Sequence, residues 1–99
     1  VKHKLELPFE IADRSPEKIM TWYEAVAYIE SLGEGWRLPI IEELHEIYNS
    51  ENDFVGSSYW SSTEYGGNFA WFQYLSSGFQ GFYNKNTSNY VRAVRSLTI

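Results

Sequence analysis

The sequence predicts an α+β domain in which two helices pack on an antiparallel sheet. A short segment of alternating apolar and polar residues comes first, and two segments with helical periodicity follow it. The second half of the chain consists of short aromatic-rich segments separated by turn residues. Because 99 residues can form one hydrophobic core, we expect the whole chain, residues 1–99, to be a single domain.

The N-terminal half contains an expected first strand and two expected helices. The segment "KLEL" at 4–7 alternates in polarity and precedes a proline, which is typical of an edge strand. Thr21 and Glu24 have the spacing of a capping box at the start of the first helix, and Gly33 provides its stop. Pro39 suits the first turn of the second helix.

The C-terminal half is expected to form strands. The expected strands are residues 57–63, 69–75, 79–83 and 90–97, with turns at 65–68 and 76–78 and a polar loop at 84–89. The stretch from Asn68 to Tyr83 contains seven aromatic residues and no charged residue. These rings either form the core or lie at the surface and bind a ligand.

The charge pattern excludes several classes of function. The net charge is −5, and every acidic residue lies at or before Glu64. Nucleic-acid binding requires clustered Lys and Arg, so nucleic acid is not an expected partner. No apolar run reaches the ~18 residues of a membrane-spanning helix, so no membrane insertion is expected. Without cysteine the chain has no disulfide and no thiolate ligand or nucleophile.

Six short segments occur in order along the chain and together resemble a known family. They are "GWRLP" at 35–39, "EEL" at 42–44, "YWSSTEY" at 59–65, "AW" at 70–71, Gly78, and "YVRAVR" at 90–95. The set resembles a bacterial and phage C-type-lectin-like domain family, and within it the variable proteins of diversity-generating retroelements. The resemblance covers about residues 21–97. It implies a C-type-lectin-like fold, with two helices on a twisted antiparallel sheet and paired first and last strands.

The resemblance also bears on the start of the second helix and on the location of the protein. The family usually has Thr or Ser after "GWRLP", whereas Ile40 stands there in this chain, which removes a helix cap worth about 1 kcal/mol. The resemblance further implies a location at the cell surface or on a virion, although the chain itself carries no targeting signal.

In such variable proteins, error-prone copying at adenines diversifies Asn codons. These codons can become Phe, Tyr, Ser, Gly or Asn codons, but not Trp, Lys, Glu or Gln codons. The positions compatible with this pattern are Gly66, Gly67, Asn68, Phe69, Phe72, Tyr74, Ser76, Ser77, Phe79, Gly81, Phe82 and Tyr83. Of these, the expected ligand-binding residues are Gly66, Asn68, Phe69, Phe72, Tyr74, Ser76, Phe79, Gly81, Phe82 and Tyr83. Ala70, Trp71, Leu75 and Gly78 are expected to be fixed, and Gln73 and Gln80 are left open.

The burial of this aromatic stretch depends on strand alternation. Trp22, Trp36, Trp60 and Trp71 are expected in the core, because tryptophan is mostly buried. Trp71 and Leu75 share one strand face. If that face is the core, Phe72 and Tyr74 point outward and form an exposed aromatic patch.

No catalytic, metal or cofactor site is expected. The Glu-Pro-Asn, Gln-Pro-Asp and Trp-Asn-Asp tripeptides of calcium-dependent lectins do not occur, and Glu51 with Asp53 is interpreted as a loop. His45 has no neighbouring ligand, and no serine has a His–Asp pattern beside it. The acidic residues Glu42, Glu43 and Glu46 are interpreted as a solvated helix face, and Arg92 and Arg95 as partners of the acidic half.

These observations favour a non-enzymatic binding module that presents an aromatic-rich, diversified surface to a macromolecule, either a protein or a cell-surface glycan. Phe and Tyr supply contact area while Ser, Gly and Asn adapt, as in antibody paratopes. Two alternatives stay open. One is a calcium-independent carbohydrate-binding module or adhesin domain that stacks sugars on Phe72, Tyr74 or Tyr83. The other is an enzyme whose site has no recognisable motif.

Overall fold

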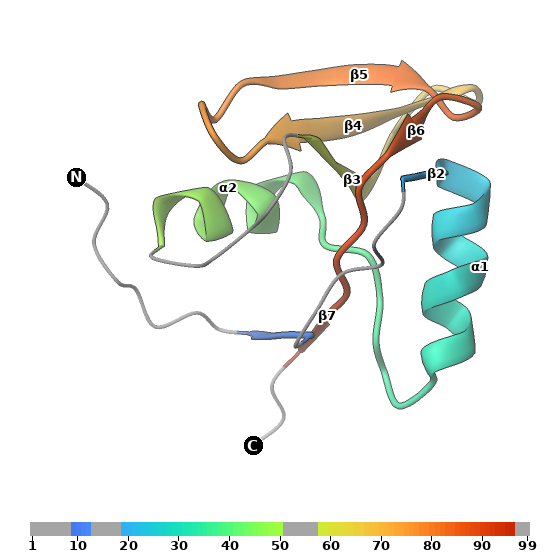
Figure 1. Cartoon of the computed structure of the whole chain (residues 1–99), viewed down its shortest axis with the longest axis vertical. Helices are drawn as coiled ribbons and strands as arrows, with labels where there is room; N and C mark the ends of the chain where they lie inside the picture. Colours follow the sequence, from blue (N-terminus) through green and yellow to red (C-terminus); the bar gives the residue numbers. More distant parts are fainter. Residues whose placement is uncertain (1–8, 13–18, 51–57, 97–99) are drawn as a thin grey trace.

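The computed structural model describes residues 9–12, 19–50 and 58–96, and these residues form an α+β fold (Figure 1). In chain order the elements are β1 (Phe9–Ile11), β2 (Met20–Thr21), α1 (Trp22–Leu32), α2 (Ile41–Asn49), β3 (Ser58–Tyr65), β4 (Phe69–Tyr74), β5 (Gln80–Asn84), β6 (Ser88–Asn89) and β7 (Val94–Ser96). The predicted fold class is confirmed.

Three antiparallel ladders hold the strands together. The largest has the order β3-β4-β5, and two short pairs join β2 to β6 and β1 to β7. The pairing of β1 with β7 confirms that the first and last strands lie side by side. The expected strand at 4–7 lies outside the described residues, and the observed strand β1 begins two positions after it.

Helix α1 begins where the sequence predicts. The hydroxyl of Thr21 accepts a hydrogen bond from the backbone N–H of Glu24 (3.2 Å), and the Glu24 carboxylate accepts one from the backbone N–H of Thr21 (2.9 Å). The helix ends before Gly33, whose φ of 64° lies in the region that favours glycine. Ala25 and Ile29 form its buried face.

Helix α2 begins at Ile41, two residues after the predicted start. Ile40 occupies the N-cap position and its side chain cannot accept a hydrogen bond. The hydroxyl of Thr63 in β3 accepts from the backbone N–H of Ile41 instead, at 2.9 Å. The register of β3 against β4 shifts between Trp60 and Glu64, so Thr63 lies in this irregular segment. A residue distant in sequence therefore supplies the cap that Ile40 lacks.

The expectation of a solvated acidic face on α2 is wrong at Glu43. Its side chain is only 12% exposed, and Arg37 donates two hydrogen bonds to its two carboxylate oxygens, at 2.7 and 2.8 Å. Burial raises the pKa of Glu43, but the hydrogen bonds from Arg37 and from the Ile40 amide, together with the Arg37 charge, outweigh it. The net pKa of Glu43 is lowered. Arg37 also donates to Ser96 (3.0 Å) and so links α2 to β7.

Two clusters of buried residues make up the core. The first packs α1 against Trp60, Ala70 and Phe72 of the three-stranded sheet. The second lies under α2 and consists of Phe9, Leu44, Ile47, Tyr59, Leu75 and Val94. Trp60 is fully buried as predicted, whereas Trp22 and Trp36 are only half-buried against the first cluster.

Candidate ligand-binding surface

Strands β4 and β5 form a hairpin in which β4 is the central strand of the three-stranded sheet and β5 is an edge strand (Figure 1). The register pairs Trp71 with Phe82 and Ala70 with Tyr83. Opposite residues of an antiparallel pair point to the same face, so the two pairs lie on opposite faces of the hairpin. Each face carries its own group of aromatic rings.

The first group, which we name the Phe82 patch, consists of Tyr65, Phe69, Trp71 and Phe82. The ring of Phe82 stacks on Tyr65 with centroids 4.2 Å apart, and it meets Phe69 and Trp71 edge-on at 5.8 and 5.5 Å. Tyr65 is 50% exposed, Phe82 43% and Phe69 37%. The patch is therefore an ordered aromatic surface in contact with solvent.

The second group, the Tyr83 patch, consists of Phe72, Tyr74, Phe79 and Tyr83. Tyr83 stacks on Phe72 with centroids 4.2 Å apart and an interplanar angle of 12°. Phe72 is only 2% exposed, whereas Phe79 is 59% and Tyr83 37% exposed. A hydrogen bond with the Tyr74 side chain, followed by burial and the charge of Tyr74, raises the pKa of Tyr83. One buried ring thus supports two exposed ones.

The expected burial of β4 is wrong at two positions. Phe72 was expected at the surface but is buried beside Trp60, and Trp71 was expected in the core but is only half-buried. Trp71 and Leu75 do share a face, and Leu75 is buried in the cluster under α2. Because α2 covers only the Leu75 end of that face, Trp71 remains in contact with solvent. Strand alternation gave the faces correctly but not the extent of the helix that covers one of them.

Gln73, which the sequence left open, belongs to the framework. Its side chain is fully buried, its carbonyl accepts a hydrogen bond from the Gln80 amide (2.9 Å), and its amide lies 3.4 Å from the imidazole Nδ1 of His45. A buried polar side chain requires such partners. Gln73 therefore ties the hairpin to α2 rather than presenting a binding group.

The other predicted site residues lie at the two ends of the hairpin or between its rings. Gly66, Gly67 and Asn68 form the exposed turn before β4, and Ser76 and Ser77 lie in the exposed turn after it. Gly81 is half-buried, and a Cβ added to it would lie 3.1 Å from the Phe72 ring and 3.2 Å from that of Phe79. The structure thus brings the predicted rings together on two faces, with Gly66 and Asn68 at one end and Ser76 at the other.

The sequence interpretation missed Tyr65 and Trp71 as surface residues. Trp71 was assigned to the fixed framework, and Tyr65 was not among the expected ligand-binding residues. The position of Tyr65 directly before the "GGN" turn was the available signal, because the tip of a hairpin extends beyond the core. For Trp71 the sequence offers no comparable signal.

Lys85 fastens the exposed end of the hairpin to α1. Its ammonium group pairs with the Glu64 carboxylate, donates to the carbonyl of Gly67 (3.1 Å) and lies 4.3 Å from the centre of the Trp22 ring. Its side chain is only 5% exposed. The turn that flanks the Phe82 patch is consequently held by a buried charge, which limits the freedom of the patch before a ligand binds.

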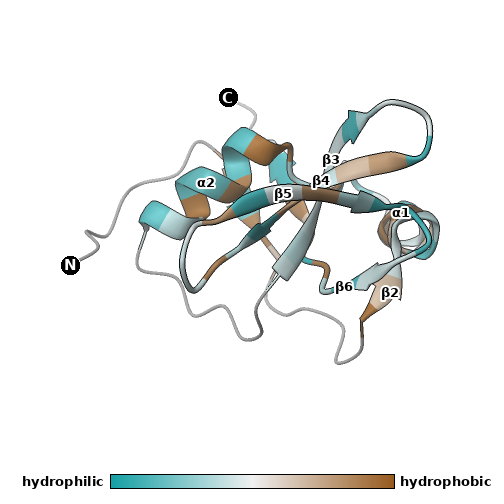
Figure 2. Ribbon diagram, turned by 90° about the horizontal axis from the view of Figure 1, so that it is seen from above, coloured by the Kyte–Doolittle hydropathy of each residue, from teal (hydrophilic) through white to brown (hydrophobic). Residues whose placement is uncertain are grey.

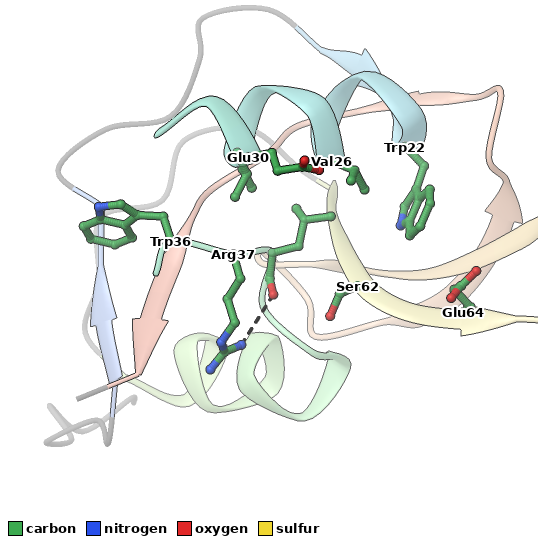
Figure 3. Close-up of a pocket in the computed structure, with 9 residues that line it drawn as sticks. Trp22, Val26, Glu30, Trp36, Arg37, Ser62 and Glu64 are labelled. Carbon is green, nitrogen blue, oxygen red and sulfur yellow. Dashed lines mark hydrogen bonds between the residues drawn. The ribbon is translucent and has the colours of Figure 1, made fainter. Parts of the chain in front are cut away.

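A groove of about 310 Å³ lies between α1 and the segment that precedes α2 (Figure 3). Val26, Ile29 and Leu38 contribute apolar surface, and Figure 3 shows Trp22 and Trp36 toward its two ends. Three charged residues line this groove: Arg37, which pairs with Glu43, Glu64, which pairs with Lys85, and Glu30. The groove was not predicted from the sequence.

Two further findings limit the chemistry of the described residues. They contain no group of three His, Asp or Glu side chains placed to hold a metal ion. Neither helix in this part of the chain is long and apolar enough to cross a membrane. The loop with Glu51 and Asp53, interpreted as a non-metal loop, lies outside the described residues.

Comparison with known proteins identifies the family. No curated protein matches the sequence. The Lcl C-terminal domain family matches residues 9–95, which include both helices and both aromatic patches. Lcl C-terminal domains are C-type-lectin-like, in agreement with the resemblance found in the sequence and with the paired β1 and β7. The chain therefore belongs to the Lcl C-terminal domain family.

Proposed function

We propose that this domain is a non-enzymatic binding module whose ligand surface is the β4–β5 hairpin. The observation that carries the proposal is the exposure of aromatic rings on both faces of one hairpin, from 37% for Phe69 and Tyr83 to 59% for Phe79. Large contiguous apolar patches on the surface of a soluble protein usually mark a site of interaction. The family match agrees with a binding role and leaves the ligand unidentified.

The proposed ligand is another macromolecule, and specifically a protein. The exposed residues of the hairpin are Phe and Tyr together with Gly, Asn and Ser in its turns, and no Lys, Arg, Asp or Glu lies between Gly66 and Asn84. Interface centres are enriched in aromatic residues and depleted in charge. Rings that already contact one another, as Tyr65 and Phe82 do, lose little conformational freedom on binding.

The finer proposal is that the surface is diversified, as in the variable proteins that the sequence resembles. Burial and packing argue against replacement at some of the candidate positions. Phe72 is core, and Gly81 lies against two rings, so replacement of either would disturb folding. The remaining candidate positions are Gly67, Asn68, Phe69, Tyr74, Ser76, Ser77, Phe79, Phe82 and Tyr83, together with Gly66, whose φ of 71° favours Gly or Asn over other residues. The proposal requires a near-copy of this gene segment, with adenines at the differing bases, beside a reverse-transcriptase gene.

A carbohydrate ligand is the second candidate, and one observation favours it. Phe79 is the most exposed ring of the Tyr83 patch and lies 6.0 Å from the ring of Tyr74, whose side chain is hydrogen-bonded to Tyr83. An apolar ring beside hydroxyl groups can stack on a sugar and hydrogen-bond to its edge. No calcium is part of this proposal.

The test is a binding screen with matched variants. Immobilised domain is presented with an array of purified bacterial surface proteins and with an array of glycans, and each hit is measured by interferometry. We expect protein hits whose affinity falls about ten-fold or more in Phe82→Ala or Phe79→Ala. The control Tyr23→Ala removes a ring that is 49% exposed on α1, and it should leave the affinity unchanged.

The outcomes separate the candidates. Hits confined to glycans, lost in Phe79→Ala but kept in Phe82→Ala, would favour the carbohydrate site. Hits that depend on Tyr23 and not on the hairpin would contradict both.

A further inference from the structure

The outer edge of β5 has no partner in the described part of the chain. The sheet order is β3-β4-β5, so β3 and β5 are its two edges. The edge of β3 is covered, because the N–H of Trp60 donates to the carbonyl of Tyr90 and the N–H of Tyr90 donates to Ser58, each at 3.0 Å. No comparable contact covers β5, which lies uncovered at the near side of the molecule in Figure 2.

The ladder between β4 and β5 shows which backbone groups point outward. The N–H of Tyr74 donates to Phe79 and the N–H of Lys85 donates to Asn68, both at 2.8 Å, so Phe79 and Lys85 face β4. The register between them is regular, and the direction of the backbone groups alternates along a strand. Gln80, Phe82 and Asn84 therefore direct their N–H and C=O groups away from the sheet. Among these groups, the Asn84 carbonyl already accepts from Thr87 at 2.9 Å.

This edge lacks the features that usually prevent strand pairing. Proteins protect exposed edges with Lys, with Pro, with bulges or by making the strand very short. The strand "QGFYN" at 80–84 contains no charge and no proline, and its register has no bulge. Its five residues pair with five of the six residues of β4, so it is not a very short strand.

We propose that the edge of β5 binds the same edge of a second copy of this chain, in antiparallel orientation, about a two-fold axis at Phe82. In this register the outward N–H and C=O of Phe82 pair reciprocally with those of the partner's Phe82. The N–H of Asn84 donates to the carbonyl of the partner's Gln80. The two sheets then form one continuous sheet, an arrangement that buries the free edge of each copy.

The sequence of β5 is self-complementary in this register. Gln80 lies opposite the partner's Asn84, so two amide side chains face each other and no like charges meet. Gly81 lies opposite the partner's Tyr83, so a residue without a side chain faces a large ring. The rings of Phe72 and Phe79 lie over Gly81, since a Cβ added to Gly81 would be 3.1 Å from the first and 3.2 Å from the second. The partner's Tyr83 would therefore meet aromatic neighbours there. Gly–aromatic cross-strand pairs of this kind stabilise edges.

The two-fold axis is perpendicular to the sheet, so the Phe82 patches of the two copies lie on the same face and become contiguous. The contact is one short strand pair, smaller than the interfaces of stable dimers, and we expect a weak, concentration-dependent dimer. This self-association is separate from the proposed ligand binding, and it is tested without any ligand.

The first experiment uses sedimentation equilibrium over a range of protein concentrations at about 0.15 M salt, where long-range charge repulsion is screened. Wild type should show a monomer–dimer equilibrium. Phe82→Lys places like charges directly opposite each other and should weaken dimerisation about ten-fold or more, as should Phe82→Glu. An equal mixture of the two variants should dimerise again, because the pair at the axis is then of opposite charge.

The second experiment uses the absence of cysteine from the chain. Paired residues that exchange both hydrogen bonds have Cα atoms about 5.5 Å apart, which is within disulfide range. Phe82→Cys should therefore form a disulfide-linked dimer rapidly under mild oxidation. The matched control is Phe69→Cys, which is similarly exposed on the same face (37% against 43%) but lies on β4, one strand away from the edge.

Two results would overturn the proposal. A wild-type protein that stays monomeric at ~1 mM, well above the dissociation constants of weak complexes, would show that the edge does not bind itself. Equal cross-linking of Phe69→Cys and Phe82→Cys would show that the copies associate by another surface. Circular dichroism of each variant should match wild type, because both altered rings are exposed.

Discussion

Gly78 offers a test of how tightly the hairpin is seated on α2. Its φ is 85°, and a Cβ added there would lie 2.7 and 2.9 Å from two ring carbons of Tyr48. An L-residue at such a φ costs about 1–2 kcal/mol, and forced overpacking typically adds about 1–3 kcal/mol. Gly78→Ala should therefore lower the free energy of unfolding by about 2–5 kcal/mol.

Substitutions at two other glycines separate the cost of backbone strain from the cost of the clash with Tyr48. Gly66 has a φ of 71° with nothing within 4 Å of an added Cβ, so Gly66→Ala should cost only the backbone strain of about 1–2 kcal/mol. Gly67 has open space and no such φ, and Gly67→Ala should stay within about 0.5 kcal/mol of wild type. In a Tyr48→Ala background, the penalty of Gly78→Ala should fall to that of Gly66→Ala.

The assay is urea denaturation followed by tryptophan fluorescence, with the slope m compared across all variants. Equal losses for Gly78→Ala and Gly66→Ala would refute the clash with Tyr48. An unchanged penalty in the Tyr48→Ala background would refute it as well.

Phe72→Ala should destabilise the fold by about 3–5 kcal/mol in chemical denaturation, whereas Phe79→Ala should change it by less than about 0.5 kcal/mol, because only Phe72 is core. The folded-state pKa of Glu43 lies below its ordinary value of 4.5, so its pairing with Arg37 stabilises the fold above that value; this contribution should be lost as the pH falls through the lowered pKa, and Glu43→Gln should flatten that part of the stability curve. Thr63→Ala should cost about 1 kcal/mol, and a Thr placed at position 40 should recover it, as measured by thermal unfolding. Calcium or a chelator should leave the melting temperature unchanged; a clear shift on adding calcium would indicate a calcium site in the folded domain.

The elements that the sequence predicts best are those encoded within a few neighbouring residues. The capping box of Thr21 and Glu24 and the turn at 65–68 depend only on local spacing and backbone preference, and both occur as expected. The aromatic content of the hairpin and its lack of charge are also visible directly. These local signals sufficed for the fold class and for the region of the candidate site.

What the sequence could not show depends on partners far away along the chain. The cap for Ile41 comes from Thr63, and β6 forms in an expected loop because its two residues pair with β2. Trp71 is only half-buried because α2 packs over Leu75 and does not extend as far as Trp71. The position of the helix, which the strand pattern does not reveal, therefore decides the exposure of Trp71. Phe72 is buried on the opposite face, because α1 packs over that face together with Trp60 and Ala70.

The pairing of β1 with β7 also determines how the domain responds to mechanical load. Phe9 lies directly opposite Ser96, at the end of the fold remote from β5 (Figure 1). A force that separates these two residues acts on the ladder one pair at a time, starting with Phe9 and Ser96 and followed by the ion pair of Glu10 with Arg95. A force between β7 and a ligand held on β5 instead runs through the body of the domain and loads many contacts together. We therefore expect the fold to open at a lower force when Phe9 and Ser96 are pulled apart than when it is pulled between β7 and the hairpin.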